Sequence, residues 1–220
     1  MHVSIVFILT TLLTVILFYK ATNTSKISLL LIACWLLLQT FLSFSGFYLV
    51  TDTFPPRFPL IALPPVLLII GLFVTSGGKI FLDSLNLKTL TLLHIIRIPV
   101  ELCLYWLFLN KTVPQLMTFE GRNFDILAGL STPLIFYFGL VKNNLSKTVL
   151  LIWNFICLGL LINIVVNAIL SVPSDFQQFA FDQPNTAILY FPFVWLPACV
   201  VPLVLLAHLA VIRKLLLKQE

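Results

Sequence analysis

Three ionisable side chains, His94, Arg97 and Glu101, interrupt an otherwise apolar stretch that runs from about residue 90 to residue 109. Placing such groups in hydrocarbon costs roughly 2.5 to 3.5 kcal/mol each, so they persist where they pair, line water or meet a ligand. A guanidinium binds carboxylate or phosphate, a neighbouring carboxylate orients it or carries a proton, and an imidazole relays protons near neutral pH. These three residue types together predict a binding site for an anionic group.

Helical spacing brings the three side chains to one face. A helix turns by 100° per residue, so His94 and Glu101, seven positions apart, differ by about 20°. Glu101 lies four residues beyond Arg97, within reach for an ion pair. Pro99 removes a backbone donor, which predicts a kink beside the charges. An ion pair that only fixes this helix to its neighbours would explain the same residues, and that alternative stays open.

Further polar side chains are candidates to complete such a site. They lie in the segments that connect the apolar runs and in the apolar run over residues 148–172. For the pair Asn163 and Asn167, one turn apart, hydrogen bonding between helices is the competing interpretation. For Asp125 and Asn185, capping of the helix that follows competes with ligand binding. The candidates beyond the central three are Glu120, Arg122, Asn123, Asp125, Asn163, Asn167, Asp182 and Asn185.

The elements that must position these residues are membrane helices. Apolar residues make up 60% of the 220 positions and charged residues only 10%, which a water-soluble globule of this size could not accommodate. The apolar runs are long and continuous rather than short and alternating, so they predict helices and not a β-barrel. We therefore predict an all-α, polytopic integral membrane protein with a single transmembrane domain over residues 1–220.

The apolar runs also predict the number of spans, because a hydrocarbon core about 30 Å thick takes about 20 helical residues to cross. The fifth run is short and the third could continue to Leu82, so six spans are the alternative to seven. The first run has no lysine or arginine ahead of it, which favours a helix over a signal peptide. The seven predicted transmembrane helices are residues 3–19, 27–50, 59–76, 88–110, 126–141, 148–172 and 188–212.

Basic residues predict the orientation, because positive charge near span ends is retained on the cytoplasmic side. With the N-terminus outside and the C-terminus cytoplasmic, most basic residues fall inside and only Arg57, Lys111 and Arg122 fall outside. The net charge of +5 then reflects membrane insertion. A nucleic-acid partner is not predicted, because the sequence contains no folded basic domain outside the bilayer to bind it. We predict a multi-pass protein of the cell membrane, and the short loops favour a bacterial inner membrane. The inner basic residues are Lys20, Lys26, Lys79, Lys88, Lys142, Lys147, Arg213, Lys214 and Lys218.

The predicted outer loops, residues 51–58, 110–125 and 173–186, alternate polar with aromatic side chains. Such loops are expected to fold back on the helix ends as a cap or vestibule. Catalytic motifs are absent from the sequence, with no H-E-x-x-H, G-x-S-x-G or phosphate-binding glycine loop. Three histidines are too few for a multi-histidine metal site, so no metal is predicted and no cofactor is assigned. A two-histidine site of His94 and His208 with Glu101 is the minor alternative.

Three classes of function fit these observations. The favoured one is a protein that binds or transports a small anionic or amphipathic molecule through the polar site on the fourth span. The second is a membrane-embedded enzyme acting on a lipid or isoprenoid, with His94 or Glu101 as acid or base. The third is a subunit or scaffold of a membrane complex whose charges serve assembly. The predicted partners are the lipid bilayer and a small-molecule or lipid ligand, and the oligomeric state is left open.

Overall fold

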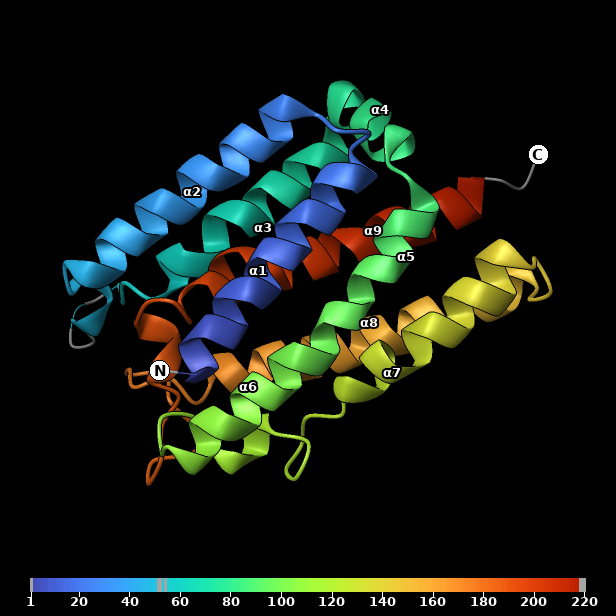
Figure 1. Ribbon diagram of the computed structural model, residues 1–220. Helices are drawn as coiled ribbons and strands as arrows, with labels where there is room; N and C mark the ends of the chain where they lie inside the picture. Colours follow the sequence, from blue (N-terminus) through green and yellow to red (C-terminus); the bar gives the residue numbers. More distant parts are fainter. Residues whose placement is uncertain (1, 51–52, 54, 218–220) are drawn as a thin grey trace.

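The computed structural model describes residues 2–50, 53 and 55–217, and all regular elements within these ranges are helical, as predicted (Figure 1). Short 3-10 turns span Phe47–Leu49, His94–Ile96, Gln115–Met117 and Ala187–Leu189, and π-helical segments span Ile135–Val141 and Leu196–Val200. The α-helices are α1 (His2–Ala21), α2 (Lys26–Phe44), α3 (Pro59–Val74), α4 (Ser76–Ser84), α5 (Leu87–Leu93), α6 (Arg97–Leu109), α7 (Ile126–Leu134), α8 (Lys147–Ile169) and α9 (Val201–Leu217).

Five of the described helical stretches are long and apolar enough to cross a membrane, and six if the bent pair α3 and α4 forms one span. Large apolar side chains also cover the outside of the bundle: on α2, Leu30 is 64% exposed and Phe41 is 70% exposed. Apolar surface of this extent is suited to lipid contact and not to water. These are the features of a multi-pass membrane protein. The five long stretches are His2–Ala21, Lys26–Phe44, Leu87–Leu109, Lys147–Ile169 and Leu196–Leu217.

Each predicted apolar run contains a helix, but two predicted boundaries were wrong by several residues. The second run was expected to reach residue 50, whereas α2 ends at Phe44 because Gly46 takes a left-handed conformation with φ of 73°. The third run matches its prediction within two residues, since α3 spans Pro59–Val74, and α4 continues beyond it at an angle of 96°. The last run was expected from residue 188, whereas its helix begins at Leu196 after a turn that contains Pro192.

The two ends of the bundle differ in chemistry. At one end, Asn23 Nδ2 donates to the Ser84 carbonyl oxygen (2.9 Å) and the Arg213 guanidinium pairs with the Asp83 carboxylate (2.9 Å). These contacts join the turn after α1, the end of α4 and the end of α9, at the upper right of Figure 1. We call this the lysine-rich end; it carries Lys20, Lys26, Lys79, Lys88, Lys142, Lys147, Arg213 and Lys214, whereas Lys218 lies outside the described residues.

The opposite end, which we call the capped end, is covered by residues 110–125 and 173–195. Gln183 Nε2 donates to the Val113 carbonyl oxygen (2.6 Å), and the Ala187 amide donates to the Thr112 carbonyl oxygen (3.0 Å). These two loops therefore fold back on each other and on the helix ends, as their composition predicts. Of the third predicted loop, residues 51, 52 and 54 lie outside the described residues.

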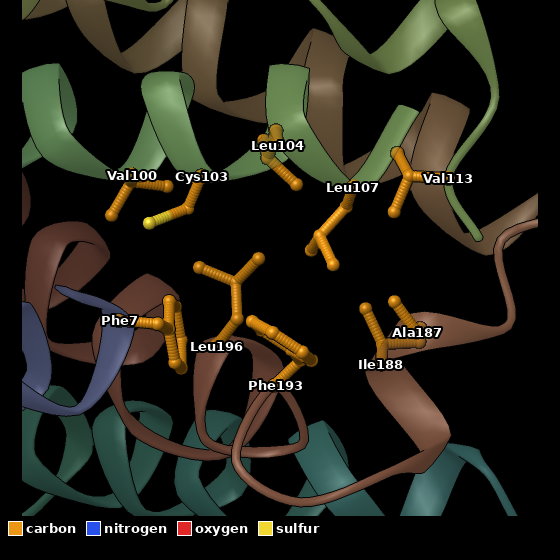
Figure 2. A pocket seen from close by; sticks show the side chains of 10 residues that line it. All are labelled: Phe7, Val100, Cys103, Leu104, Leu107, Val113, Ala187, Ile188, Phe193 and Leu196. Atoms are coloured by element: carbon orange, nitrogen blue, oxygen red, sulfur yellow. The ribbon is translucent and has the colours of Figure 1, made fainter. Parts of the chain in front are cut away.

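A small apolar cavity of about 10 Å³ lies beneath this cap (Figure 2). Val100, Cys103 and Leu107 of α6 face it from one side, and Phe193 and Leu196 face it from the other. A cavity of this volume has room for at most about one water molecule, and its apolar walls offer that water no partner. The capped end is therefore closely packed.

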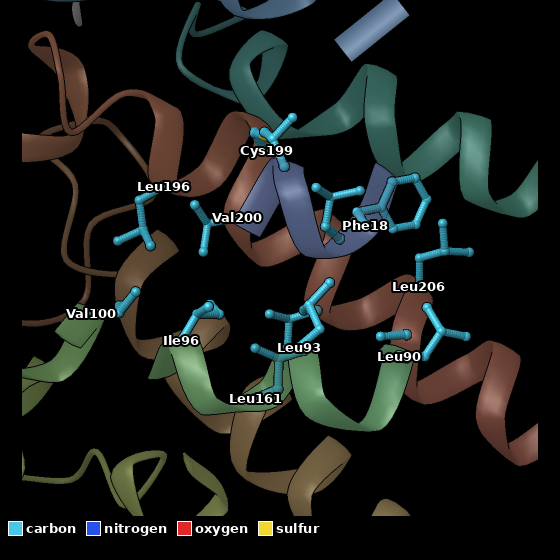
Figure 3. Packing of buried hydrophobic residues seen from close by; sticks show 14 of the residues in the cluster. Phe18, Leu90, Leu93, Ile96, Val100, Leu161, Leu196, Cys199, Val200 and Leu206 are labelled. Carbon is cyan, nitrogen blue, oxygen red and sulfur yellow. The ribbon is translucent and has the colours of Figure 1, made fainter. Parts of the chain in front are cut away.

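The segment formed by α5, the turn at His94–Ile96 and α6 lies in the middle of the bundle. Its side chains Leu90, Leu93 and Ile96 are at most 1% exposed and belong to one cluster with Phe18 of α1 and Leu206 of α9 (Figure 3). Helix association in lipid depends on close packing rather than on removal of apolar surface from water.

α7 packs closely against α6 where the two helices cross. A Cβ atom added at Gly129 would lie 2.8 Å from Ile98 Cγ1, 3.1 Å from the Ile98 amide nitrogen and 3.3 Å from Arg97 Cβ. Glycine is required at this position because any side chain would push α7 away from α6.

We expect Gly129→Ala to lower the free energy of unfolding by about 1–3 kcal/mol, because the methyl group overpacks this crossing. Gly159→Ala is the matched control, since a Cβ at Gly159 meets nothing within 4 Å and alanine favours the helix. The measurement is reversible unfolding of the purified protein in mixed micelles. Equal stabilities of the two variants would contradict the described crossing.

Candidate functional site

The backbone around Arg97 is shaped by Pro99. Proline cannot donate to the carbonyl one turn earlier, so the helix tightens into the 3-10 turn at His94–Ile96 and restarts as α6 at Arg97. Pro99 therefore falls in the first turn of α6, where its missing donor costs nothing. The predicted kink is this turn, and it places Arg97 at the start of a helix in the middle of the bundle.

Arg97 is 2% exposed and receives partners from three other helical regions. Its Nη1 atom donates to Asp125 Oδ1 (2.8 Å) and to the Cys157 carbonyl oxygen (3.3 Å), and Nη2 lies 2.9 Å from His208 Nε2. Asp125 precedes α7, Cys157 belongs to α8 and His208 belongs to α9. One guanidinium thus joins four segments of the bundle.

His208 extends this network toward the lysine-rich end. A guanidinium only donates hydrogen bonds, so His208 Nε2 accepts from Arg97 and the ring hydrogen resides on Nδ1. Nδ1 then donates to Asn154 Oδ1 (3.0 Å), and Asn154 Nδ2 donates to the Leu150 carbonyl oxygen (2.8 Å). Every polar atom of the His208 ring is paired.

Asn123 extends the network toward the capped end. Its Oδ1 accepts from the Asp125 amide (3.0 Å), an Asx turn that holds both side chains ahead of α7. Its Nδ2 lies 2.8 Å and 2.7 Å from the two carboxylate oxygens of Glu101 and 3.0 Å from the Met117 carbonyl oxygen. Glu101, 1% exposed, is therefore bound to the loop before α7.

One expectation and two capping alternatives from the sequence were wrong at this point. Arg97 was expected to pair with Glu101, but its ion-pair partner is Asp125, because the loop before α7 brings a second carboxylate to the guanidinium and Asn123 to Glu101. Asp125 was a candidate helix cap, but its side chain makes no capping hydrogen bond and is directed to Arg97 instead. Asn185 does not cap the turn after it either.

His94 is the exception within this network. It is 0% exposed, and neither of its ring nitrogens has a hydrogen-bond partner among the described residues. Its ring stacks on His208 with a centroid distance of 3.8 Å and an interplanar angle of 17°, and it meets Trp153 edge to face at 5.7 Å. Nε of Arg97 is likewise buried without a partner. Three unpaired nitrogens therefore lie in one cluster.

The remaining predicted residues lie outside this network. Asn163 Nδ2 donates to the Arg122 carbonyl oxygen (2.9 Å), and Asn167 Nδ2 donates to the Asn163 carbonyl oxygen (2.9 Å). Asn185 is buried against the end of α8, where its Nδ2 donates to the Ala168 carbonyl oxygen (3.3 Å). Asn163 and Asn185 therefore secure the loops to α8, whereas the Asn167 bond lies within α8. Glu120, Arg122 and Asp182 are exposed at the capped end.

Sequence reasoning undervalued two members of the network, His208 and Asn154. Each is a single polar residue inside a long apolar run, and such residues in membrane helices usually pair with one another. That signal was available, but it does not say which isolated polar residues meet. The two-histidine site with Glu101 does not form, because the two rings stack in parallel and Glu101 is bound to Asn123. No group of three potential metal ligands lies together among the described residues.

Access to the network differs between the two ends. Toward the capped end, Val100 and Leu104 beside Glu101 line the small apolar cavity. At the lysine-rich end, a groove of about 310 Å³ lies between α5, the π-helical segment after α7, α8 and α9. Leu150 lines this groove, and it is the residue whose carbonyl oxygen binds Asn154. Asn154 is thus joined to the wall of this groove, whereas at the capped end the side chain of Asp125 keeps 7% exposure.

Comparison with known proteins finds no matching protein-family model, no matching curated protein and no matching solved structure. Function is therefore argued from the chemistry of the site.

The two histidines provide a test of the described network. We expect His208→Phe to lower the free energy of unfolding by about 1–3 kcal/mol, because it leaves Arg97 Nη2 and Asn154 Oδ1 buried without partners. His94→Phe keeps an aromatic ring against His208 and removes no hydrogen bond, so its stability should stay within about 1 kcal/mol of the original. Unfolding of both variants in mixed micelles measures this difference. A larger loss in His94→Phe than in His208→Phe would contradict the described hydrogen bonds.

Proposed function

We propose that this protein binds a small anionic or amphipathic molecule in the buried polar network around Arg97 and carries it across the membrane. The observation that carries this proposal is the set of unpaired nitrogens on His94 and Arg97. Buried polar atoms in a low-dielectric interior are almost always paired, since an unpaired one costs about 1–3 kcal/mol. A network that served packing alone would have no reason to keep three of them.

The unpaired atoms also indicate the chemistry of the ligand. Nε of Arg97 carries a hydrogen, and a neutral imidazole has one N–H and one acceptor nitrogen. A ligand oxygen of a carboxylate or carbonyl group can accept from both donors, and charge-assisted bonds of this type are the stronger ones. Asp125 already balances the guanidinium, so the site holds its shape before the ligand arrives.

The unequal access at the two ends supports a carrier in particular. Alternating access requires the site to be closed on one side while a path exists on the other. Close packing at the capped end and the groove at the lysine-rich end fit one state of such a cycle. An enzyme would need a second reactive group beside the ligand, and with the carboxylates of Asp125 and Glu101 both engaged by partners, His94 alone is left as an acid or base.

For the membrane topology we propose seven crossings, with the N-terminus outside and the lysine-rich end in the cytoplasm. Ile126–Val141 is a shorter apolar helix than the five long stretches, and α3 with α4 is bent, so these two are the additional crossings. Seven crossings place the basic residues of the helix ends together on the cytoplasmic side, as insertion requires. A bacterial inner membrane is the membrane proposed.

A pair of reporter fusions tests this topology. A fluorescent protein fused after the C-terminus should fluoresce in bacterial cells, because it folds in the cytoplasm, and alkaline phosphatase at the same position should be inactive. The same reporters fused after residue 112, at the capped end, should give the opposite result. Fluorescence at both positions, or at residue 112 alone, would contradict the proposed orientation.

Trp153 provides a local reporter for ligand binding, because its ring contacts His94. We expect titration of the purified full-length protein with dodecanoate, below its micelle concentration, to give a saturable change in tryptophan emission. His94→Phe should weaken this response at least about tenfold, a loss of about 1.4 kcal/mol, because it removes the ring nitrogens.

Two controls accompany this titration. Trp153→Phe should lose the emission change, which shows that the signal comes from beside His94, and thermal unfolding should show that His94→Phe remains folded. A His94→Phe protein that responds like the original would refute the proposed binding site. A saturable response that survives Trp153→Phe would place the ligand elsewhere.

A further inference from the structure

The groove at the lysine-rich end combines apolar walls with one cationic side chain. Leu87 of α5, Leu150 of α8 and Leu215 of α9 form its walls, and Lys147 and Asn143 lie at its rim. Lys147 is half-buried, unlike the exposed Lys79 and Lys142 at the same end. The groove residues include no acidic side chain, and the one described carboxylate at this end, Asp83, is paired with Arg213.

The floor of the groove is in direct contact with the polar network. Leu150 is buried at 7% exposure, and its carbonyl oxygen accepts from Asn154 Nδ2 at 2.8 Å. Asn154 lies one helical turn further along α8, a rise of about 5–6 Å. The side chain of Leu150 lies against Gly139, where an added Cβ would be 2.7 Å from Leu150 Cδ2. The backbone of Leu150 therefore connects the groove wall to the network.

Volume and charge together select a ligand class. About 310 Å³ is at the small end of the range for pockets that hold drug-sized molecules, which suits one alkyl chain better than the two chains of a phospholipid. Apolar walls favour the chain, each buried methylene contributing about 0.8 kcal/mol when it leaves water. Lys147 at the rim favours an anionic head group.

We propose that this groove is the entry site for a single-chain carboxylate amphiphile, whose alkyl chain lies against Leu150 and Leu215 while its carboxylate pairs with Lys147. This inference rests on the proposed function, because it identifies the substrate class and the route by which the substrate reaches Arg97. The groove binds the molecule first, and displacement of Leu150 beside Gly139 opens the path to the network.

The test compares dodecanoate with dodecanol, which have the same chain but differ in head-group charge. Binding is measured as the rise in the thermal unfolding midpoint of the full-length protein in a nonionic detergent, since any ligand of the folded state raises it. We expect dodecanoate to bind about three- to fivefold more tightly than dodecanol, which is the range for a partly exposed ion pair.

Lys147→Gln should abolish this preference for the carboxylate, whereas Lys79→Gln, exposed at the same end but outside the groove, should retain it. Gly139→Leu should weaken both ligands, because its side chain occupies the groove. Equal behaviour of the two lysine variants would overturn the proposal. Displacement of dodecanoate by an equimolar amount of phosphatidylglycerol would also overturn it, since the occupant would then be a membrane phospholipid.

The outcome separates this inference from the proposed function. Loss of the preference in Lys147→Gln together with an unchanged Trp153 response in His94→Phe would support the groove and refute the network as a binding site. Loss of the Trp153 response in His94→Phe with an unaltered preference in Lys147→Gln would support the network and refute the groove as its entry site.

Discussion

The ion pair between Arg97 and Asp125 is the interaction on which the interior of this protein depends. A guanidinium with 2% exposure in a membrane bundle is tolerable only where a carboxylate and further acceptors surround it. These acceptors come from the segments that carry Asp125, Cys157 and His208, so pairing the charge also fixes how α6, α7, α8 and α9 meet. Gly129 lets α7 approach closely enough for this pairing.

Most polar atoms around this ion pair have hydrogen-bond partners, so the unpaired nitrogens of His94 are informative. His208 uses both ring nitrogens, whereas His94, stacked on it, uses neither. The same residue type in the same cluster is therefore fully paired at one position and unpaired at the other, and this difference is the basis of the proposed binding site. At the lysine-rich end, Leu150 both lines the groove and accepts a hydrogen bond from Asn154 through its carbonyl oxygen.

Much of this arrangement could be predicted, and the errors have clear physical reasons. The burial of His94, Arg97 and Glu101 followed from their position in an apolar run, and a break in the helix followed from Pro99. The partner of Arg97 did not follow, because an i, i+4 carboxylate is the nearest one in sequence and Asp125 is the nearest one in space. The end of α2 before Gly46 and the start of the last helix after Pro192 were not predicted, because apolar residues continue on both sides of these two positions.

The sequence by itself determined that the chain forms apolar helices with a charged cluster inside, because solvation cost depends on residue type and run length. The tertiary structure decided which polar atoms pair, which remain unpaired and where the groove opens. The reason is distance along the chain: Arg97 and His208 are 111 positions apart, and no local pattern encodes a contact of that separation. Helix packing brings these two residues together, and the site is a consequence of that packing.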